Sequence, residues 1–470
     1  MLSSGDRASL RVLSPCAFFW SRNMEPLSPA SGGSVRARGR ILTRHRTTIT
    51  TAHIAVLIGL AMSSIAHAAE ALSLPQAVQA ALARSPALVA QDAAARSARD
   101  MAVAAGQRPD PVLRLSLDNV PLSGPDRFST SRDFMTAKSV SLMQTLPSAA
   151  KRQARTARFE REAQTAEAGR VEQAATIGRE TAMAWLERHA LEQRLALLHE
   201  QLGEARLLVQ ASESAARSGS GSPADWIAAR ESVAQLQQTL LGVEAERQNA
   251  RLTLTRWTGS TPDQPLAAPP DLASSPFGTG DVSERLTHHP ELLRLSAQEA
   301  AMVAEAEVAR QEREPDWSTE LMLSLRGSGY PNMVSLAVSV PLPWDRPQRQ
   351  DRELAARLAQ VDGLRAEREE RAREHQAEAR RWEAGWRAGL AQLALIDAER
   401  LPLAEQRIQT TLAAYRGGRT PLSEVLAARR MALDLRMERI ELQRSTASLW
   451  AQLAYLIPAE PAAAAKGVTP

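Results

Sequence analysis

Apolar and polar residues alternate one by one over two neighbouring segments in the second half of the chain. The alternation runs from Trp317 to Arg326, pauses over the Gly/Pro/Asn-containing stretch 327–332, and resumes from Val334 to Leu342. A period of two places successive side chains on opposite faces of a strand, so the pattern predicts an antiparallel hairpin with one apolar face and one small or polar face. Each strand has about ten residues, which is the length that crosses a bilayer when tilted. Trp317, at the start of the first strand, is a candidate interfacial aromatic anchor.

The first half of the chain contains an equivalent pair of segments. Residues 112–118 alternate in the same way, and a return strand is expected near 137–146, although Lys138 and Gln144 fall on its apolar face. In a soluble protein such hairpins would belong to a β-sandwich with one face in the core. Long charged helical patterns flank both hairpins and leave no strands for a second sheet, which favours hairpins that cross a membrane.

Helical patterns recur in the same order around the two hairpins. A capping box, Ser73 with Gln76, begins the first helical segment, and Asp281 with Glu284 begins its counterpart. A Gly/Ser-rich break follows each long helix, and a proline begins each third helix. In chain order the expected helices are 73–107, 149–218 and 223–258 in the first half, and 281–314, 349–417 and 421–457 in the second. The first helix of each half is expected to be interrupted at a proline, near Pro86 and at Pro290.

The lengths of these helices indicate how they pack. A helix of about 70 residues is on the order of 100 Å long. The two shorter helices of each half together reach about the length of the long one, so we expect them to lie end to end beside it, in a tube of constant height. A cytoplasmic coiled coil would explain the helices but neither the hairpins nor a signal peptide.

The number of strands determines how many chains must combine. Four strands cannot close a barrel, and an open sheet edge in lipid leaves unpaired backbone groups that cost several kcal/mol each. Several copies must therefore share one sheet, and three copies supply twelve strands.

The N-terminal segment has the pattern of a secretory signal. A basic stretch at 44–46, a short apolar run at 54–62 and a small-x-small site predict cleavage after Ala68. The sequence therefore divides into a leader and signal peptide (1–68), a first repeat (69–258), a linker (259–280), a second repeat (281–458) and a disordered tail (459–470).

Composition and charge argue against several other classes of function. The 470-residue chain has a formal net charge of +4, but its basic N-terminal segment supplies that excess, so the charge does not indicate nucleic-acid binding. The abundance of Ala, Leu, Arg, Glu and Gln is typical of long helices. The single cysteine, Cys16, precedes the cleavage site, and neither a zinc motif nor a catalytic motif is present. We therefore expect no enzymatic activity, no catalytic residue, no cofactor and no metal site.

One adjacent pair of histidines, His288 and His289, raises the question of metal binding. No cysteine or carboxylate cluster converges on the pair in the sequence, and a solvated pair at a helix interruption is the better interpretation. His189, His199 and His375 lie singly on helical segments and are expected to be polar surface residues.

The order of these features resembles that of the TolC family of outer-membrane efflux ducts, over essentially the whole stretch 69–458. The resemblance implies a mainly α-helical homotrimer with membrane β-hairpins. Its twelve-stranded β-barrel would lie in the outer membrane of a Gram-negative bacterium, and its long helical barrel in the periplasm. It also implies a passive gated conduit that works with a periplasmic adaptor protein and an inner-membrane transporter of the RND type. Segments 118–126, 132–135 and 143–144 look most like the heavy-metal (cation) efflux branch, so such cations are a candidate cargo.

The turn after the second long helix is similar to the tip motif of that family. On this resemblance Tyr415 and Glu424 occupy the tyrosine and acidic positions that close the periplasmic mouth, and Arg419 lies within one position of the arginine. Asp225 is the first-half equivalent of Glu424, whereas the second acidic position of the motif is Ala427 here. Three copies of a carboxylate around a narrow axis would form a negative ring that attracts cations. The alternative role of the two acids is to complement the dipoles of the helices that they begin.

Two other classes of protein remain open. A periplasmic adaptor is also secreted and built on helical hairpins, but it would carry a split lipoyl-like module and a β-rich domain around a single hairpin. A structural periplasmic coiled-coil protein would be extracted from membranes by salt or alkali. Two equivalent halves that each carry membrane-length strands favour the duct.

Overall fold

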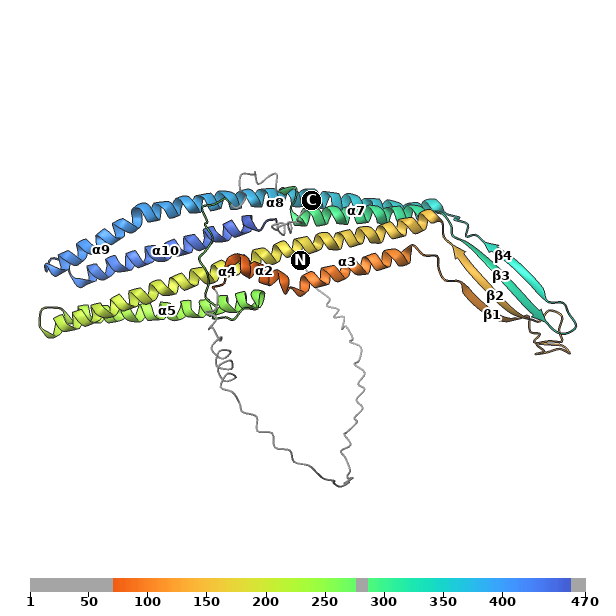
Figure 1. The fold of residues 1–470 in the computed structure, drawn as a ribbon, viewed down its shortest axis with the longest axis horizontal. Coiled ribbons are helices and arrows are strands. Elements are labelled where there is room, and N and C mark those ends of the chain that lie inside the picture. The colour runs from red at the N-terminus through yellow and green to blue at the C-terminus, as the bar shows by residue number, and fades with distance from the viewer. Residues whose placement is uncertain (1–70, 276–285, 458–470) are drawn as a thin grey trace, which may run out of the picture. The chain divides into compact units, whose positions relative to one another are not determined.

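The same series of elements occurs twice along the chain, in a computed structural model that describes residues 71–275 and 286–457 (Figure 1). The first series consists of α2 (Leu74–Ala83), α3 (Pro86–Ala105), β1 (Val112–Asp118), β2 (Ala137–Leu146), α4 (Ala149–Arg217) and α5 (Pro223–Thr258). The second consists of α7 (Pro290–Gln311), β3 (Trp317–Arg326), β4 (Met333–Ser339), α8 (Gln350–Leu395), α9 (Leu401–Arg416) and α10 (Leu422–Ala454). The predicted signal peptide, the capping box at 281–284 and the tail 459–470 lie outside the described residues.

Local sequence explains where several of these helices begin and end. Ser73 and Gln76 form the predicted capping box at the start of α2. The breaks after α4 and α9 each contain a glycine with positive φ, Gly219 at 74° and Gly418 at 68°, a conformation that a side chain makes costly. Pro223 then begins α5 with a φ already suited to a helix.

The second long helix, predicted over 349–417, runs from Gln350 to Arg416 and contains one irregular turn. A π-helical turn, Ile396–Arg400, separates α8 from α9. Pro402 follows in the first turn of α9, and proline has no N–H to donate while its ring clashes with the carbonyl four residues earlier. The widened turn accommodates that clash, because it contains the residue that carries this carbonyl.

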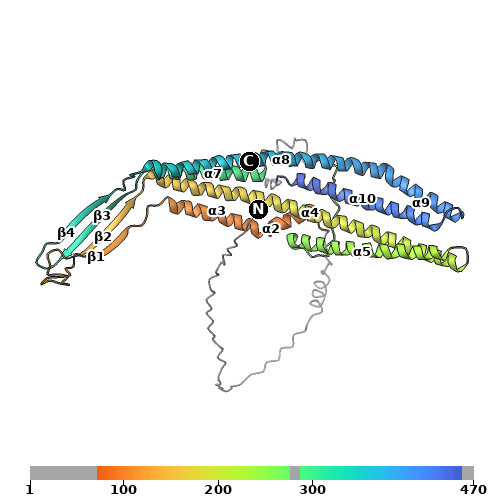
Figure 2. The same cartoon turned by 180° about the vertical axis from the view of Figure 1, so that it is seen from behind.

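Each long helical segment is flanked by shorter helices arranged end to end (Figures 1 and 2). α4 packs against α3 and α5, while α8 packs against α7 and α10, and α9 continues along α10. The helices α2, α3 and α5 have 10, 20 and 36 residues, against 69 for α4, which confirms the expected match in length for the first half. Contacts of α4 with α7 and α10 join the two halves. None of the helices in the described part of the chain carries an apolar stretch sufficient for a membrane span.

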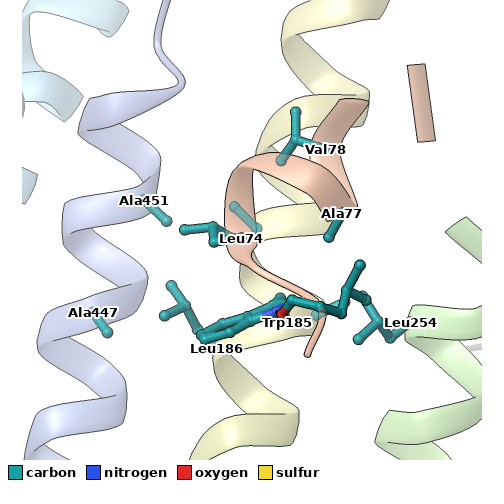
Figure 3. Packing of buried hydrophobic residues seen from close by; sticks show 11 residues of the cluster. Leu74, Ala77, Val78, Trp185, Leu186, Leu254, Ala447 and Ala451 are labelled. Atoms are coloured by element: carbon teal, nitrogen blue, oxygen red, sulfur yellow. The ribbon is translucent and has the colours of Figure 1, made fainter. Parts of the chain in front are cut away.

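The apolar core where the short helices meet is centred on Trp185 of α4 (Figure 3). Side chains of α2, α4, α5 and α10 contribute to it: Leu74, Ala77, Val78, Trp185, Leu186, Leu254, Ala447 and Ala451. The indole Nε1 donates to the carbonyl oxygen of Leu72 at 2.9 Å, so its one polar atom is satisfied inside the core.

The predicted linker 259–280 packs against the helices as far as residue 275, where its description ends. Leu72 and Leu266 form an isolated parallel bridge. Two further indoles donate to linker carbonyls, Trp386 to Leu272 at 2.9 Å and Trp450 to Ser274 at 3.2 Å. This part of the linker is therefore tied to both halves of the chain.

The four strands form one antiparallel sheet in the order β1-β2-β3-β4. Its register places like residues in rows across the strands: Leu113, Leu142, Leu321 and Leu336 in one row, and Ser116, Ser139 and Ser324 in another. The outer strands β1 and β4 have seven residues each, against ten for β2 and β3. β4 ends at Ser339 rather than at Leu342, because Pro341 has no N–H for a ladder hydrogen bond.

Candidate pore wall and gate

The sheet exposes its apolar face, and its two central strands bury serines on the opposite face. Leu336 is 74% exposed, whereas Ser139 on the other face is only 4% exposed. The Ser139 hydroxyl donates to the carboxylate of Asp118 at 2.7 Å and lies 3.1 Å from the hydroxyl of Ser324. The exposed apolar side chains are Leu113, Leu115, Leu117, Leu142, Leu321, Leu323, Leu325, Val334, Leu336 and Val338. An apolar face of this extent, interrupted by the exposed Lys138, is a surface for lipid or for a protein partner.

Aromatic side chains lie at both ends of the sheet. Trp317 is exposed at the first position of β3, opposite Leu146 at the end of β2 where the helices connect. Phe128, Phe134 and Tyr330 are exposed in the loops at the other end. This distribution is the one expected of the aromatic girdles that flank a membrane barrel, and it supports the predicted role of Trp317 as an anchor.

A buried lysine holds the junction between the helices and the sheet. Lys151, in the first turn of α4, is 2% exposed. Its Nζ donates to the Asp316 carboxylate at 2.7 Å and to the carbonyl of Glu314 at 2.8 Å, and it lies 3.3 Å from the carboxylate of Glu312. The lysine thus fixes the segment that enters β3 against the helix that leaves β2. Sequence analysis missed it, because its partners follow more than 150 residues later.

The predicted gate residues lie in and beside the two turns that follow the long helical segments. Tyr415 is half-buried in the last turn of α9, and Arg419 is exposed in the turn itself. Glu424 is exposed in the first turn of α10, and Asp225 is half-buried in the first turn of α5. One chain therefore places both acids where the helix-dipole alternative requires them. A ring of carboxylates would need further copies of the chain.

Ion pairs join the two helical hairpins, one of them near these turns. Arg429 of α10, five residues beyond Glu424, donates to Glu204 of α4 at 2.7 Å. Arg444 of α10 donates to Glu187 of α4 at 2.9 Å. These contacts, which sequence analysis did not single out, hold the α9–α10 hairpin against the α4–α5 hairpin within one chain.

A second set of ion pairs connects the π-helical turn to α10. Asp397 accepts from Nη2 of Arg439 at 3.0 Å, and Arg400 donates to Glu438 at 2.7 Å. The hydrogen bonds from Arg439 hold the pKa of the Asp397 carboxyl below its usual value. Two charged residues of the π-helical turn therefore hold it against α10.

The histidines differ from the expectation of isolated, solvated side chains. His289 is 7% exposed, and its ring centroid lies 4.0 Å from that of His375 on α8. Nε2 of His375 lies 2.9 Å from the carboxylate of Glu291. Burial, and secondarily the neighbouring His375, lowers the pKa of His289 to about 4. His189 is also not a free surface residue, because its ring stacks on Trp185 with centroids 5.3 Å apart.

A sheet with one exposed apolar face, joined to paired helices of this length, is the arrangement expected of an outer-membrane efflux channel. Residues 77–260, most of the first repeat, match the family described as Outer membrane efflux protein. No curated relative matches the chain.

The fold is similar to that of several solved outer-membrane proteins. OprN, an outer-membrane channel, is 18% identical with a TM-score of 0.69, and the similarity covers 81% of this chain and 89% of OprN. VceC from Vibrio cholerae is 20% identical with a TM-score of 0.65 over 82% of this chain and 95% of VceC. CusC is 16% identical with a TM-score of 0.69 over 81% and 91% of the two chains. These similarities confirm the TolC-like fold over both repeats.

Proposed function

We propose that three copies of this chain assemble into an efflux duct, with a twelve-stranded barrel in the outer membrane and a helical tunnel in the periplasm. The outward apolar face of the four-stranded sheet carries the proposal. β1 and β4 each have one unpaired edge in a single chain, and open edges are costly in lipid. Pairing β4 of one copy with β1 of the next removes every open edge when three copies close the ring.

The assembly is tested on protein extracted from outer membranes with detergent. We expect a trimer that keeps its mass in mild SDS and dissociates on heating. A protein that is monomeric and soluble without detergent would contradict the duct. A protein released from membranes by alkali alone would instead support the coiled-coil alternative.

The duct would form the outer part of a tripartite pump, with a periplasmic adaptor protein and an inner-membrane RND transporter as partners. The chain itself would be a passive conduit without catalytic activity, because the transporter supplies the work. The family match supports the conduit role. The structure also disfavours the adaptor alternative, since the described residues contain a single sheet and no separate β-rich domain.

Heavy-metal cations are the cargo that we propose for this conduit. The support is the resemblance of segments 118–126, 132–135 and 143–144 to the cation efflux branch. A strain that lacks the chain should lose resistance to metals of a panel and keep its resistance to hydrophobic drugs. Loss of drug resistance alone would contradict the cargo and leave the duct intact.

The periplasmic gate would consist of Glu424 and Asp225, with Tyr415 and Arg419 holding the closed mouth. Three Glu424 carboxylates around the axis would attract cations through a negative ring. In planar bilayers, Glu424→Ala should therefore raise conductance and reduce the preference for cations. Glu369→Ala, at an exposed carboxylate on α8, is the matched control. Unchanged conductance and cation preference in the Glu424 variant would remove the assignment and leave the helix-dipole role.

A further inference from the structure

We propose that His289, Glu291 and His375 bind one divalent transition-metal cation where the start of α7 meets α8. The cation would be a resident one that ties two helices together. The proposal depends on neither the cargo nor the gate, because these residues lie far in the sequence from the candidate gate turns.

The atoms that would bind the cation already lie close together in the structure. One imidazole nitrogen from each histidine and one oxygen of Glu291 lie within 4.8 Å of one another. Metal bonds of about 2.0–2.1 Å in tetrahedral geometry need donors about 3.3 Å apart. Nε2 of His375 and Oε2 of Glu291 are 2.9 Å apart and need only to separate slightly. His289 needs to approach by on the order of an ångström, which a small rotation about its side-chain bonds supplies.

A buried polar atom points to a missing partner at this place. Nδ1 of His289 is inaccessible to solvent and has no hydrogen-bond partner among the described residues. Buried polar atoms in folded proteins are nearly always paired, so an orphan of this kind calls for an explanation. A bound cation provides one.

The surroundings favour a cation and orient its ligands. The three residues line a cavity of about 530 Å³, together with three further carboxylates, from Glu172, Glu180 and Glu378, and one guanidinium, from Arg179. Nδ1 of His375 lies 3.5 Å from the carboxylate of Glu378, the outer partner that fixes a ligating imidazole. Arg371 lies 3.7 Å from Oε1 of Glu291 and leaves Oε2 to the site.

The donor set indicates which metals bind. Two imidazoles and one carboxylate suit Zn²⁺, Co²⁺, Ni²⁺ and Cu²⁺, whereas Mg²⁺ and Ca²⁺ prefer oxygen ligands alone. None of the three donor residues carries a thiolate or a thioether, so this donor set disfavours Cu⁺. The cavity leaves room for water at the remaining coordination positions.

The test uses the purified full-length protein in detergent, prepared with an affinity tag that contains no histidine and stripped with EDTA. Titration with Co²⁺ should give visible absorption bands that saturate at one ion per chain and disappear on addition of Zn²⁺. Zn²⁺ should also raise the unfolding temperature, because it binds only the folded chain. His375→Gln and Glu291→Gln should weaken Co²⁺ binding at least tenfold.

His288→Gln is the matched control, because His288 is adjacent to the site in sequence but exposed. It should bind Co²⁺ as the unaltered protein does. Equal losses in the His288 and His375 variants would overturn the proposal, as would the absence of Co²⁺ bands in the unaltered protein. If the His375 variant does not fold, the Glu291 variant, which keeps its size and a hydrogen-bonding amide, decides the question. A monomeric protein that still binds one Co²⁺ per chain would contradict the duct and support the metal site.

Discussion

At the scale of single residues, the buried lysine at the helix–sheet junction makes the sharpest prediction. Lys151→Met keeps the length of the side chain but leaves Asp316 without its cation, and breaking a buried ion pair costs about 3–5 kcal/mol. The variant should unfold at a lower temperature than the unaltered protein in detergent. Arg99→Met is the control, since the Arg99–Glu167 pair is exposed and worth at most about 1 kcal/mol. Equal unfolding temperatures for the two variants would show that Lys151 does not hold the junction.

Residue contacts were also what the sequence predicted least well. His289 was expected to be solvated because no cluster of ligands surrounds it in the sequence, yet His375 reaches it from a helix 86 positions later. The same is true of Lys151 and Asp316. Glu291, two residues after His289, was the one visible signal of the cluster. Such sites arise from tertiary packing, which a local pattern does not encode.

At the scale of secondary-structure elements, the contacts that hold the π-helical turn between α8 and α9 against α10 can be tested. Asp397→Asn should remove the contact with Arg439 and increase hydrogen exchange of the α9 amides near neutral pH. Because Arg439 lowers the pKa of Asp397 in the folded state, the pair stabilises the fold above the ordinary carboxyl pKa of 3.8 and is lost as pH falls through the lower, folded value.

The difference in exchange between the variant and the unaltered protein should therefore be constant from about pH 5 to pH 7 and shrink only below about pH 4. Asp362→Asn is the control, because Asp362 is exposed and pairs only with Arg365 in its own helix. A difference that already vanishes near pH 6 would mean that another group controls the turn.

The bounds of strands and helices were predicted well wherever the local spacing of apolar residues determines them. The bounds of β1, β2 and β3 agree with the alternation, and α4 ends within one residue of its predicted end. Two details were not predicted, and both involve proline: Pro341 shortens β4, and Pro402 accompanies the π-helical turn within the second long helix. Proline removes a backbone donor, so both residues were signals that the hydrophobic pattern alone obscured.

At the scale of the whole molecule, the sheet determines which surface meets lipid. Leu336 and Ser335 are neighbours on β4 with side chains on opposite faces. If three sheets close with the leucine rows outward, Leu336→Arg places a charge in the bilayer at a cost of about 2–4 kcal/mol. Ser335→Arg places the same charge on the polar inner face, where it is hydrated.

Leu336→Arg should therefore reduce the yield of heat-dissociable trimers from outer membranes, whereas Ser335→Arg should assemble normally and change only the conductance or ion preference in planar bilayers. The two substitutions lie at neighbouring positions of the same strand and add the same charge, so they differ only in the face of the sheet that carries the arginine. The opposite outcome, with Ser335→Arg failing to assemble and Leu336→Arg assembling, would place lipid on the serine face. Equal tolerance of both would mean that neither face meets lipid, and the leucine rows would then be a surface for a protein partner.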